Sequence, residues 1–157
     1  MASSVDYTGR KVDLNIFQGV QPVGDTQVYL GLGDAGEVVT GIQKLCQAFA
    51  KIFLTITGTM EYHPTMGTNF VSAVKTGRIQ DEADVRGEFA LAADTVRQIL
   101  NLDAEKTNPP DDEALASTTL EQVSVDKAAS KITLFVRVTS VAGNSRVVYL
   151  PVPAAIR

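Results

Sequence analysis

The sequence has little of what most catalytic and metal sites are built from. Its 157 residues include one cysteine, Cys46, one histidine, His63, and no tryptophan. One cysteine cannot form an internal disulfide, and one cysteine with one histidine cannot supply the four ligands of a structural zinc site. No second histidine pairs with His63, and no Gly-x-Ser-x-Gly motif presents a serine nucleophile. We therefore expect no catalytic residues, no metal and no cofactor, and a protein that is not an enzyme.

Positive charge is scarce as well. The chain has 14 Lys and Arg against 18 Asp and Glu, a net charge of -4, and no cluster of basic residues. Phosphate contacts supply most of the affinity for nucleic acid, so we expect no nucleic-acid binding. No apolar run approaches the ~20 residues that cross a bilayer, and the N-terminus lacks the layout of a signal peptide. We expect no membrane contact, and synthesis in a reducing cytoplasm.

Two segments have the apolar spacing of amphipathic helices. Residues 80–101 form one of them, and acidic residues stand at its start, where the helix dipole favours negative charge. Residues 37–53 form the other. Its apolar side chains recur at steps of three and four, at Val38, Ile42, Leu45, Phe49 and Ile52. A shorter helix is predicted at 71–79.

The last third of the chain alternates apolar and polar residues, as antiparallel strands do. Residues 120–126, 131–141 and 146–152 predict a three-stranded meander with 131–141 in its centre. Residues 103–119 include Asn-Pro-Pro-Asp-Asp-Glu and predict a surface loop with solvated acidic side chains. The fold class is therefore α+β. Two main helices pack on a small three-stranded antiparallel sheet in a single domain, residues 37–157.

Residues 1–36 show no helical period and predict an extended N-terminal arm. Such an arm packs on its own domain or reaches a neighbouring molecule, and the sequence leaves both alternatives open. Residues 31–36 read Gly-Leu-Gly-Asp-Ala-Gly, which matches the Gly-x-Gly-x-x-Gly dinucleotide fingerprint. The alternating strands and helices of a dinucleotide fold do not follow this motif. We therefore interpret it as a glycine-rich approach to the first helix.

The segment between the first two helical patterns contains residues suited to tight turns. Gly58 and Gly67 permit positive φ, and Pro64 fixes its own φ. Thr68 and Phe70 follow the second glycine, and Phe70 offers an apolar anchor. These five residues are the candidate structural motif of the chain.

The order of helix, loop with Pro and Gly, helix and three-stranded meander resembles the baseplate wedge protein of contractile phage tails. This lysozyme-like wedge or sheath-initiator family also has a member in type VI secretion baseplates. In the family, the segment between the helices contains a Gly, then a Pro, then a second Gly. A small residue follows the second Gly, and an aliphatic or aromatic residue comes after it. Gly58, Pro64, Gly67, Thr68 and Phe70 stand in those places.

The likeness covers residues 38–152 apart from the 103–119 segment. Many members carry Glu-Pro-Arg where the second helix gives way to the first strand, and the triplet is associated with docking to the baseplate core. This chain has no such triplet at that junction. Docking by that route is therefore not expected, and nothing in the sequence separates a phage baseplate from a secretion-system baseplate.

The resemblance implies a structural protein of the virion, located in the tail baseplate. Its implied partners are other wedge subunits, the tail sheath protein, and hub or tube proteins. In such a protein the first sheath subunits add strands to a sheet edge, here 120–126 or 146–152, and satisfy its free N–H and C=O groups. The candidate partner-binding residues are Phe135 on the outer face of the sheet, with Val147 and Tyr149.

Two alternatives remain. A peptidoglycan-cleaving, lysozyme-like enzyme needs two carboxylates facing a cleft, and Glu61 is the only acid close to His63 in the central loop. We expect Glu61 to be an exposed loop residue instead. The other alternative is a different tail structural protein, such as a tube-end protein.

Overall fold

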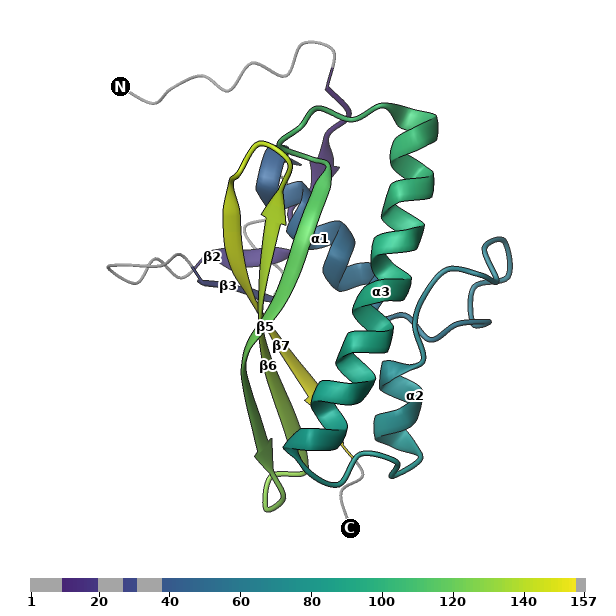
Figure 1. Ribbon diagram of the computed structural model, residues 1–157, viewed down its shortest axis with the longest axis vertical. Helices are drawn as coiled ribbons and strands as arrows, with labels where there is room; N and C mark the ends of the chain where they lie inside the picture. The colour runs from purple at the N-terminus through teal and green to yellow at the C-terminus, as the bar shows by residue number, and fades with distance from the viewer. Residues whose placement is uncertain (1–9, 20–26, 31–37, 155–157) are drawn as a thin grey trace.

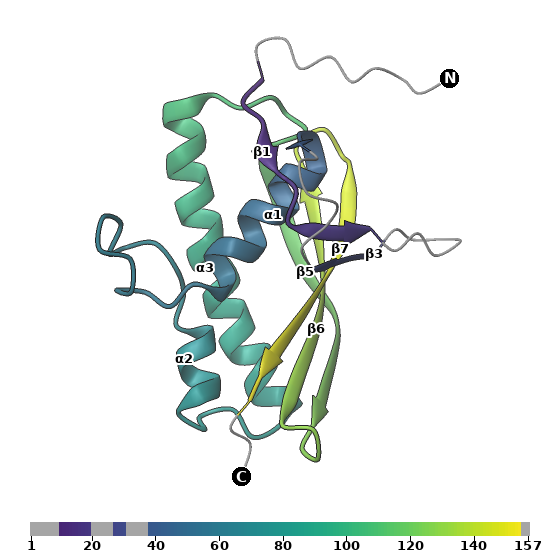
Figure 2. The same ribbon diagram turned by 180° about the vertical axis from the view of Figure 1, so that it is seen from behind.

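The computed structural model describes residues 10–19, 27–30 and 38–154 (Figure 1). Three helices lie on one side of three long antiparallel strands (Figures 1 and 2). The helices are α1 (Gly41–Leu54), α2 (Phe70–Lys75) and α3 (Glu82–Thr107). The strands are β5 (Leu115–Asp126), β6 (Lys131–Ser140) and β7 (Ser145–Pro153), with β6 between the other two. The predicted α+β class and the antiparallel meander are confirmed.

Short strands from the N-terminal region extend the sheet beyond β7. Strands β2 (Phe17–Gly19) and β3 (Gln27–Leu30) pair with each other, and β3 runs parallel to β7. The sheet order is β2-β3-β7-β6-β5. A separate two-stranded sheet joins β1 (Asp13–Leu14) to β4 (Val38–Val39). The sequence gives only a weak strand signal at residues 12–16 and a possible extended piece at 27–30, because segments of two to four residues are too short to show a period.

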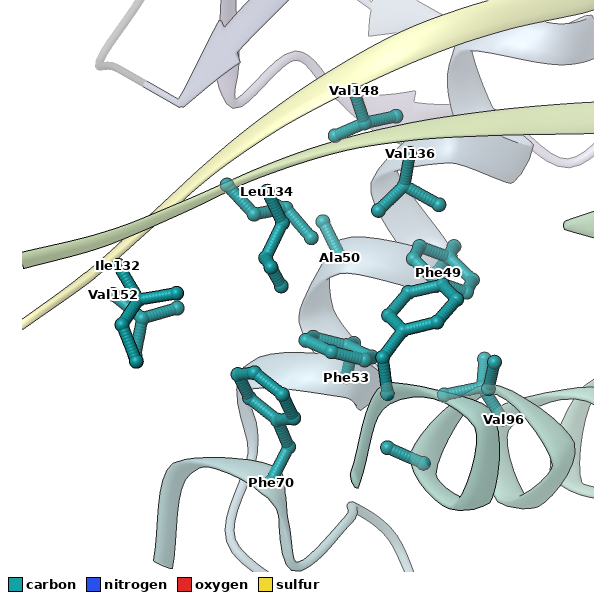
Figure 3. Close-up of a cluster of buried hydrophobic side chains, with 14 of the residues drawn as sticks. Phe49, Ala50, Phe53, Phe70, Val96, Ile132, Leu134, Val136, Val148 and Val152 are labelled. Carbon is teal, nitrogen blue, oxygen red and sulfur yellow. The ribbon is translucent and has the colours of Figure 1, made fainter. Parts of the chain in front are cut away.

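The core lies between the meander and the helices. Alternate residues of β6 face the helices and are fully buried: Ile132, Leu134, Val136 and Val138. On the other side, Phe53 of α1 packs among three aromatic rings (Figure 3). Its ring centroid lies 4.8 Å from that of Phe70 and 5.6 Å from those of Phe49 and Phe89. These rings join all three helices.

The predicted surface loop at 103–119 is wrong at both of its ends. Helix α3 continues to Thr107, and β5 already begins at Leu115. The helix ends where Asn108 adopts a left-handed φ of 45° just before two prolines, which cannot continue a helix. The connection is therefore confined to residues 108–114.

The other helices also begin later or end sooner than their patterns predict. Helix α1 begins at Gly41, because Val38 pairs with Leu14 in the small sheet and is exposed. Val38 is therefore not part of the buried helical stripe. Helix α2 covers Phe70–Lys75, so it begins one residue before the predicted 71–79 and ends four residues sooner, since Gly77 has a φ of 72°.

Residues 10–16 of the arm pack along α1 (Figure 2). Gln47 is a buried residue of α1, and its amide donates hydrogen bonds to Asp13 Oδ2 at 2.8 Å and to the Leu14 carbonyl at 2.6 Å. Lys51 forms an ion pair with Asp13 at 2.6 Å. Of the two alternatives for the arm, this part packs on its own domain.

The remaining arm segments, 1–9, 20–26 and 31–36, lie outside the described residues. The interpretation of the glycine-rich motif at 31–36 is therefore still a prediction.

Two of the acidic residues before β5, Asp112 and Glu113, are not solvated as predicted, whereas Asp111 is exposed. The side chain of Glu113 is only 4% exposed. It accepts a hydrogen bond from the Gly41 N–H at 3.0 Å and pairs with Lys44 at 2.6 Å. Arg10 pairs with the neighbouring Asp112 at 2.9 Å. Glu113 thus places a negative charge at the positive end of the α1 dipole and satisfies one of its free N–H groups.

Acid should release residues 10–16 from α1. Burial raises the pKa of the Asp13 carboxyl, but hydrogen bonds from Lys51 and Gln47 outweigh it, and the pKa lies below its usual 3.8. A carboxylate with a depressed pKa stabilises the folded contact above its ordinary pKa, and this contribution is lost as the pH falls through the folded value. Amide hydrogen exchange of 10–16, corrected for the intrinsic pH dependence, should therefore accelerate below about pH 4.

The variant Asp13→Asn keeps the shape of the side chain but cannot ionise. It should lose this pH step, while the β6 amides remain slow in both proteins. The same acid step in Asp13→Asn would show that another group controls the contact.

Candidate protein-binding surface

Close backbone contacts form the base of the central loop. The Thr68 N–H donates to the Thr55 carbonyl at 2.8 Å. Gly67 has a φ of 115°, and a Cβ at this position would lie 2.5 Å from the same carbonyl oxygen. Phe70 is buried against Phe53. Three residues of the candidate motif therefore join the end of α1 to the start of α2.

The other two motif residues shape the outer part of the loop. Gly58 has a φ of 85°, and its N–H donates to the Pro64 carbonyl at 3.0 Å. Glu61, Tyr62 and His63 all lie on the exposed tip between them. Because the Glu61 side chain is exposed to solvent, its surroundings do not resemble the apolar pocket of a catalytic acid.

One long edge of the sheet has no strand partner among the described residues. Strand β5 pairs with β6 on one side only. Its register shifts twice, between Leu115 and Ser117 and between Leu120 and Gln122. Such bulges bend an edge locally and leave regular stretches on either side of each shift. Residues 120–126 therefore lie on an edge strand, as predicted, and this strand begins five residues earlier, at Leu115.

A groove runs beside the first half of this edge; we call it the edge groove. Its cavity volume is about 530 Å³. Residues 116–120 of β5 form one wall, and Phe89, Ala90, Ala93, Asp94 and Arg97 of α3 form the other. Two of these residues are alanines, so the helix leaves room for side chains next to the strand.

The other predicted edge is partly closed. Strand β3 pairs with residues 147–149 of β7, so the expectation that all of 146–152 is a free edge is wrong. Val147, a candidate partner-binding residue, is 4% exposed. Its side chain therefore offers almost no surface to another protein.

The outer face of the sheet carries an aromatic pair. Phe135 and Tyr149 are cross-strand neighbours, and their rings meet edge to face with centroids 5.3 Å apart. This contact leaves Phe135 half-buried, where the sequence predicts an exposed side chain. Lys131 Nζ lies 3.1 Å from the Tyr149 hydroxyl, and this hydrogen bond lowers the pKa of Tyr149. The pair presents an amphipathic patch beside the closed part of the β7 edge.

Sequence reasoning missed the buried polar residues Gln47 and Glu113. Both bind segments far away in the chain, and no spacing rule links a helix to such distant partners. The only available signal was the position of Gln47 beside the apolar residues of α1.

Comparisons with protein-family models, with curated proteins and with solved structures find no match. In residues 10–19, 27–30 and 38–154, no group of three His, Cys, Asp or Glu side chains could hold a metal ion. No helix within these ranges is long and apolar enough to cross a membrane. The β5 edge and the edge groove are the candidate surface that the strand pairing supports best.

Proposed function

We propose that this protein is a structural, non-enzymatic part of a contractile-tail baseplate wedge, located in the virion. It joins the wedge to hub or tube proteins and offers a sheet edge on which the sheath protein begins to assemble. The observation that carries the proposal is the long edge of β5, open along the described residues and backed by the edge groove. The order of helices, loop and meander, which resembles the wedge family, also supports it.

The physical basis is strand addition. A strand from the sheath protein that pairs with β5 satisfies the outward N–H and C=O groups of the edge, and every second side chain points toward the helical side. There the edge groove, with Ala90 and Ala93, receives these side chains. Since β3 already occupies residues 147–149 of β7, the added strand belongs at β5.

Filling the edge groove should stop sheath assembly without unfolding the protein. Ala90 is exposed on α3, so Ala90→Trp should leave the melting temperature within a few degrees of the wild type. Tails assembled with this variant should lack a sheath in electron micrographs. Leu91→Trp is the matched control, because Leu91 is 68% exposed and is not part of the groove wall. Tails with this control should carry normal sheaths.

Normal sheaths on Ala90→Trp tails would exclude the edge groove as the place where the sheath begins. Tails that never contain the protein would contradict the wedge assignment as a whole. Clearing of a peptidoglycan suspension that Glu61→Gln abolishes would support the lysozyme-like alternative instead.

A further inference from the structure

Residues 57–66 form a loop that projects beyond the helices, here called the knob (Figures 1 and 2). Its backbone is held by internal hydrogen bonds, including His63 N–H to the Met60 carbonyl at 3.2 Å and Met66 N–H to the His63 carbonyl at 2.9 Å. Tyr62, at its tip, is 86% exposed. A loop that is already ordered loses little entropy on binding, and tyrosine is enriched at protein interfaces.

A second groove lies between α1 and α3, next to the knob; we call it the interhelix groove. Its cavity volume is about 530 Å³. Its apolar lining consists of Ala48, Ile52, Met66, Ile99, Leu100 and Leu102. Leu102 is 57% exposed, which is unusual for a large apolar side chain in a row of apolar neighbours.

The charged residues that line the interhelix groove are two cations, Lys51 and Lys106, and one acid, Asp103. Asp13 pairs with Lys51, whereas Lys106 has no ionic partner within the described residues. The knob carries one acid, Glu61, next to Tyr62 in the chain. A tyrosine inserted into such a groove would therefore bring a carboxylate close to an unpaired ammonium group.

We propose that a second copy of this chain occupies the interhelix groove, with its Tyr62 inserted and its Glu61 beside Lys106. The knob and the groove share His63, Thr65 and Met66, so they form one continuous patch. A two-fold dimer uses the same patch on both subunits, which is what an adjacent projection and recess provide. Each dimer then has two identical contacts. This inference is independent of the baseplate proposal.

Sedimentation velocity over a concentration series tests the dimer. Tyr62→Ala should raise the dimer dissociation constant by about 30-fold, because buried aromatic anchors dominate such interfaces. Leu102→Glu should weaken the dimer similarly, since it places a charge in the apolar groove. Both positions are exposed, so circular dichroism and melting temperature should remain those of the wild type.

Mixing the two variants separates a dimer contact from a folding defect. In a mixed pair, the intact Tyr62 of the Leu102→Glu chain meets the intact groove of the Tyr62→Ala chain. One of the two contacts is then restored, so the mixture should dimerise more tightly than either variant alone.

The rim charges give a second test. Glu61→Lys and Lys106→Glu should each weaken the dimer by about threefold, and the double variant should restore it, because exposed ion pairs make small contributions. A wild-type protein that remains monomeric at every concentration would overturn the proposal. The proposal would also be overturned if the mixed variants dimerised no more tightly than either variant alone. Capture of only a different protein by a photocrosslinker at position 62 would overturn it as well.

Discussion

Replacing Phe53 by alanine should lower the free energy of unfolding by about 3–5 kcal/mol. Phe53 is fully buried, and its ring packs against Phe49, Phe70 and Phe89, so its loss opens a cavity where all three helices meet. The surrounding rings belong to different elements and cannot close that cavity without moving the helices. Guanidinium unfolding followed by circular dichroism measures the change.

Leu91→Ala is the matched control, since Leu91 is a large apolar residue of α3 that is mostly exposed. Its effect should stay below about 0.5 kcal/mol. Phe53→Leu should lie between the two variants, because it keeps part of the buried volume. A loss for Phe53→Ala as small as that of the control would show that the aromatic cluster does not hold the helices together.

Replacing Gly67 by alanine should cost about 3 kcal/mol of stability, the second largest effect that we expect. Two causes add. A φ of 115° strains any residue with a Cβ, and the new methyl group would lie 2.5 Å from the Thr55 carbonyl oxygen. The relief of this clash would pull apart the hydrogen bond from Thr68 to Thr55 at the base of the loop. The same denaturation experiment measures the loss.

Gly58→Ala separates the two causes. Gly58 also has a positive φ, 85°, but no atom lies within 4 Å of its added Cβ. Its substitution should therefore cost only the backbone strain, about 1–2 kcal/mol. Equal losses at the two positions would mean that the contact with Thr55 contributes nothing, and that backbone conformation alone explains both glycines.

The elements that could be predicted from the sequence are those whose apolar spacing repeats over many residues. Helix α3 and strand β6 each repeat their apolar spacing over several turns or pairs, and both appear with the expected face buried. The ends of elements were less predictable. The period fades in 103–107, yet these residues continue α3, because none of them breaks a helix before the prolines.

Contacts between distant polar residues could not be predicted. Asp13 and Gln47 are 34 residues apart, and Gly41 and Glu113 are 72 apart. Local sequence carries no sign of such pairs. The residues around a carboxylate in the sequence do not show whether it is solvated or caps a distant helix. The sequence therefore predicts solvated side chains for the acidic residues at 111–113.

The candidate surface was predictable only in part. Alternation in β6 correctly places Phe135 on the outer face, and chain order identifies β5 as an edge strand. The partial closure of β7 was not predictable, because β3 is four residues long and pairs with residues about 120 positions away. A parallel pair formed at such a distance depends on tertiary structure and leaves no trace in local spacing.

The capping of α1 by Glu113 has a consequence for the order in which the chain folds. Helix α3 begins with its own cap, since Asp81 accepts the Asp84 N–H, and it can start from local sequence. Thr40 provides no such bond for α1, and the first turn of α1 contains no acidic residue. A chain still on the ribosome and ending before Glu113 therefore lacks the group that completes its first helix. We therefore expect the first turn of α1 to stay frayed until synthesis has passed Glu113, and the domain to fold as one unit after the C-terminal strands follow.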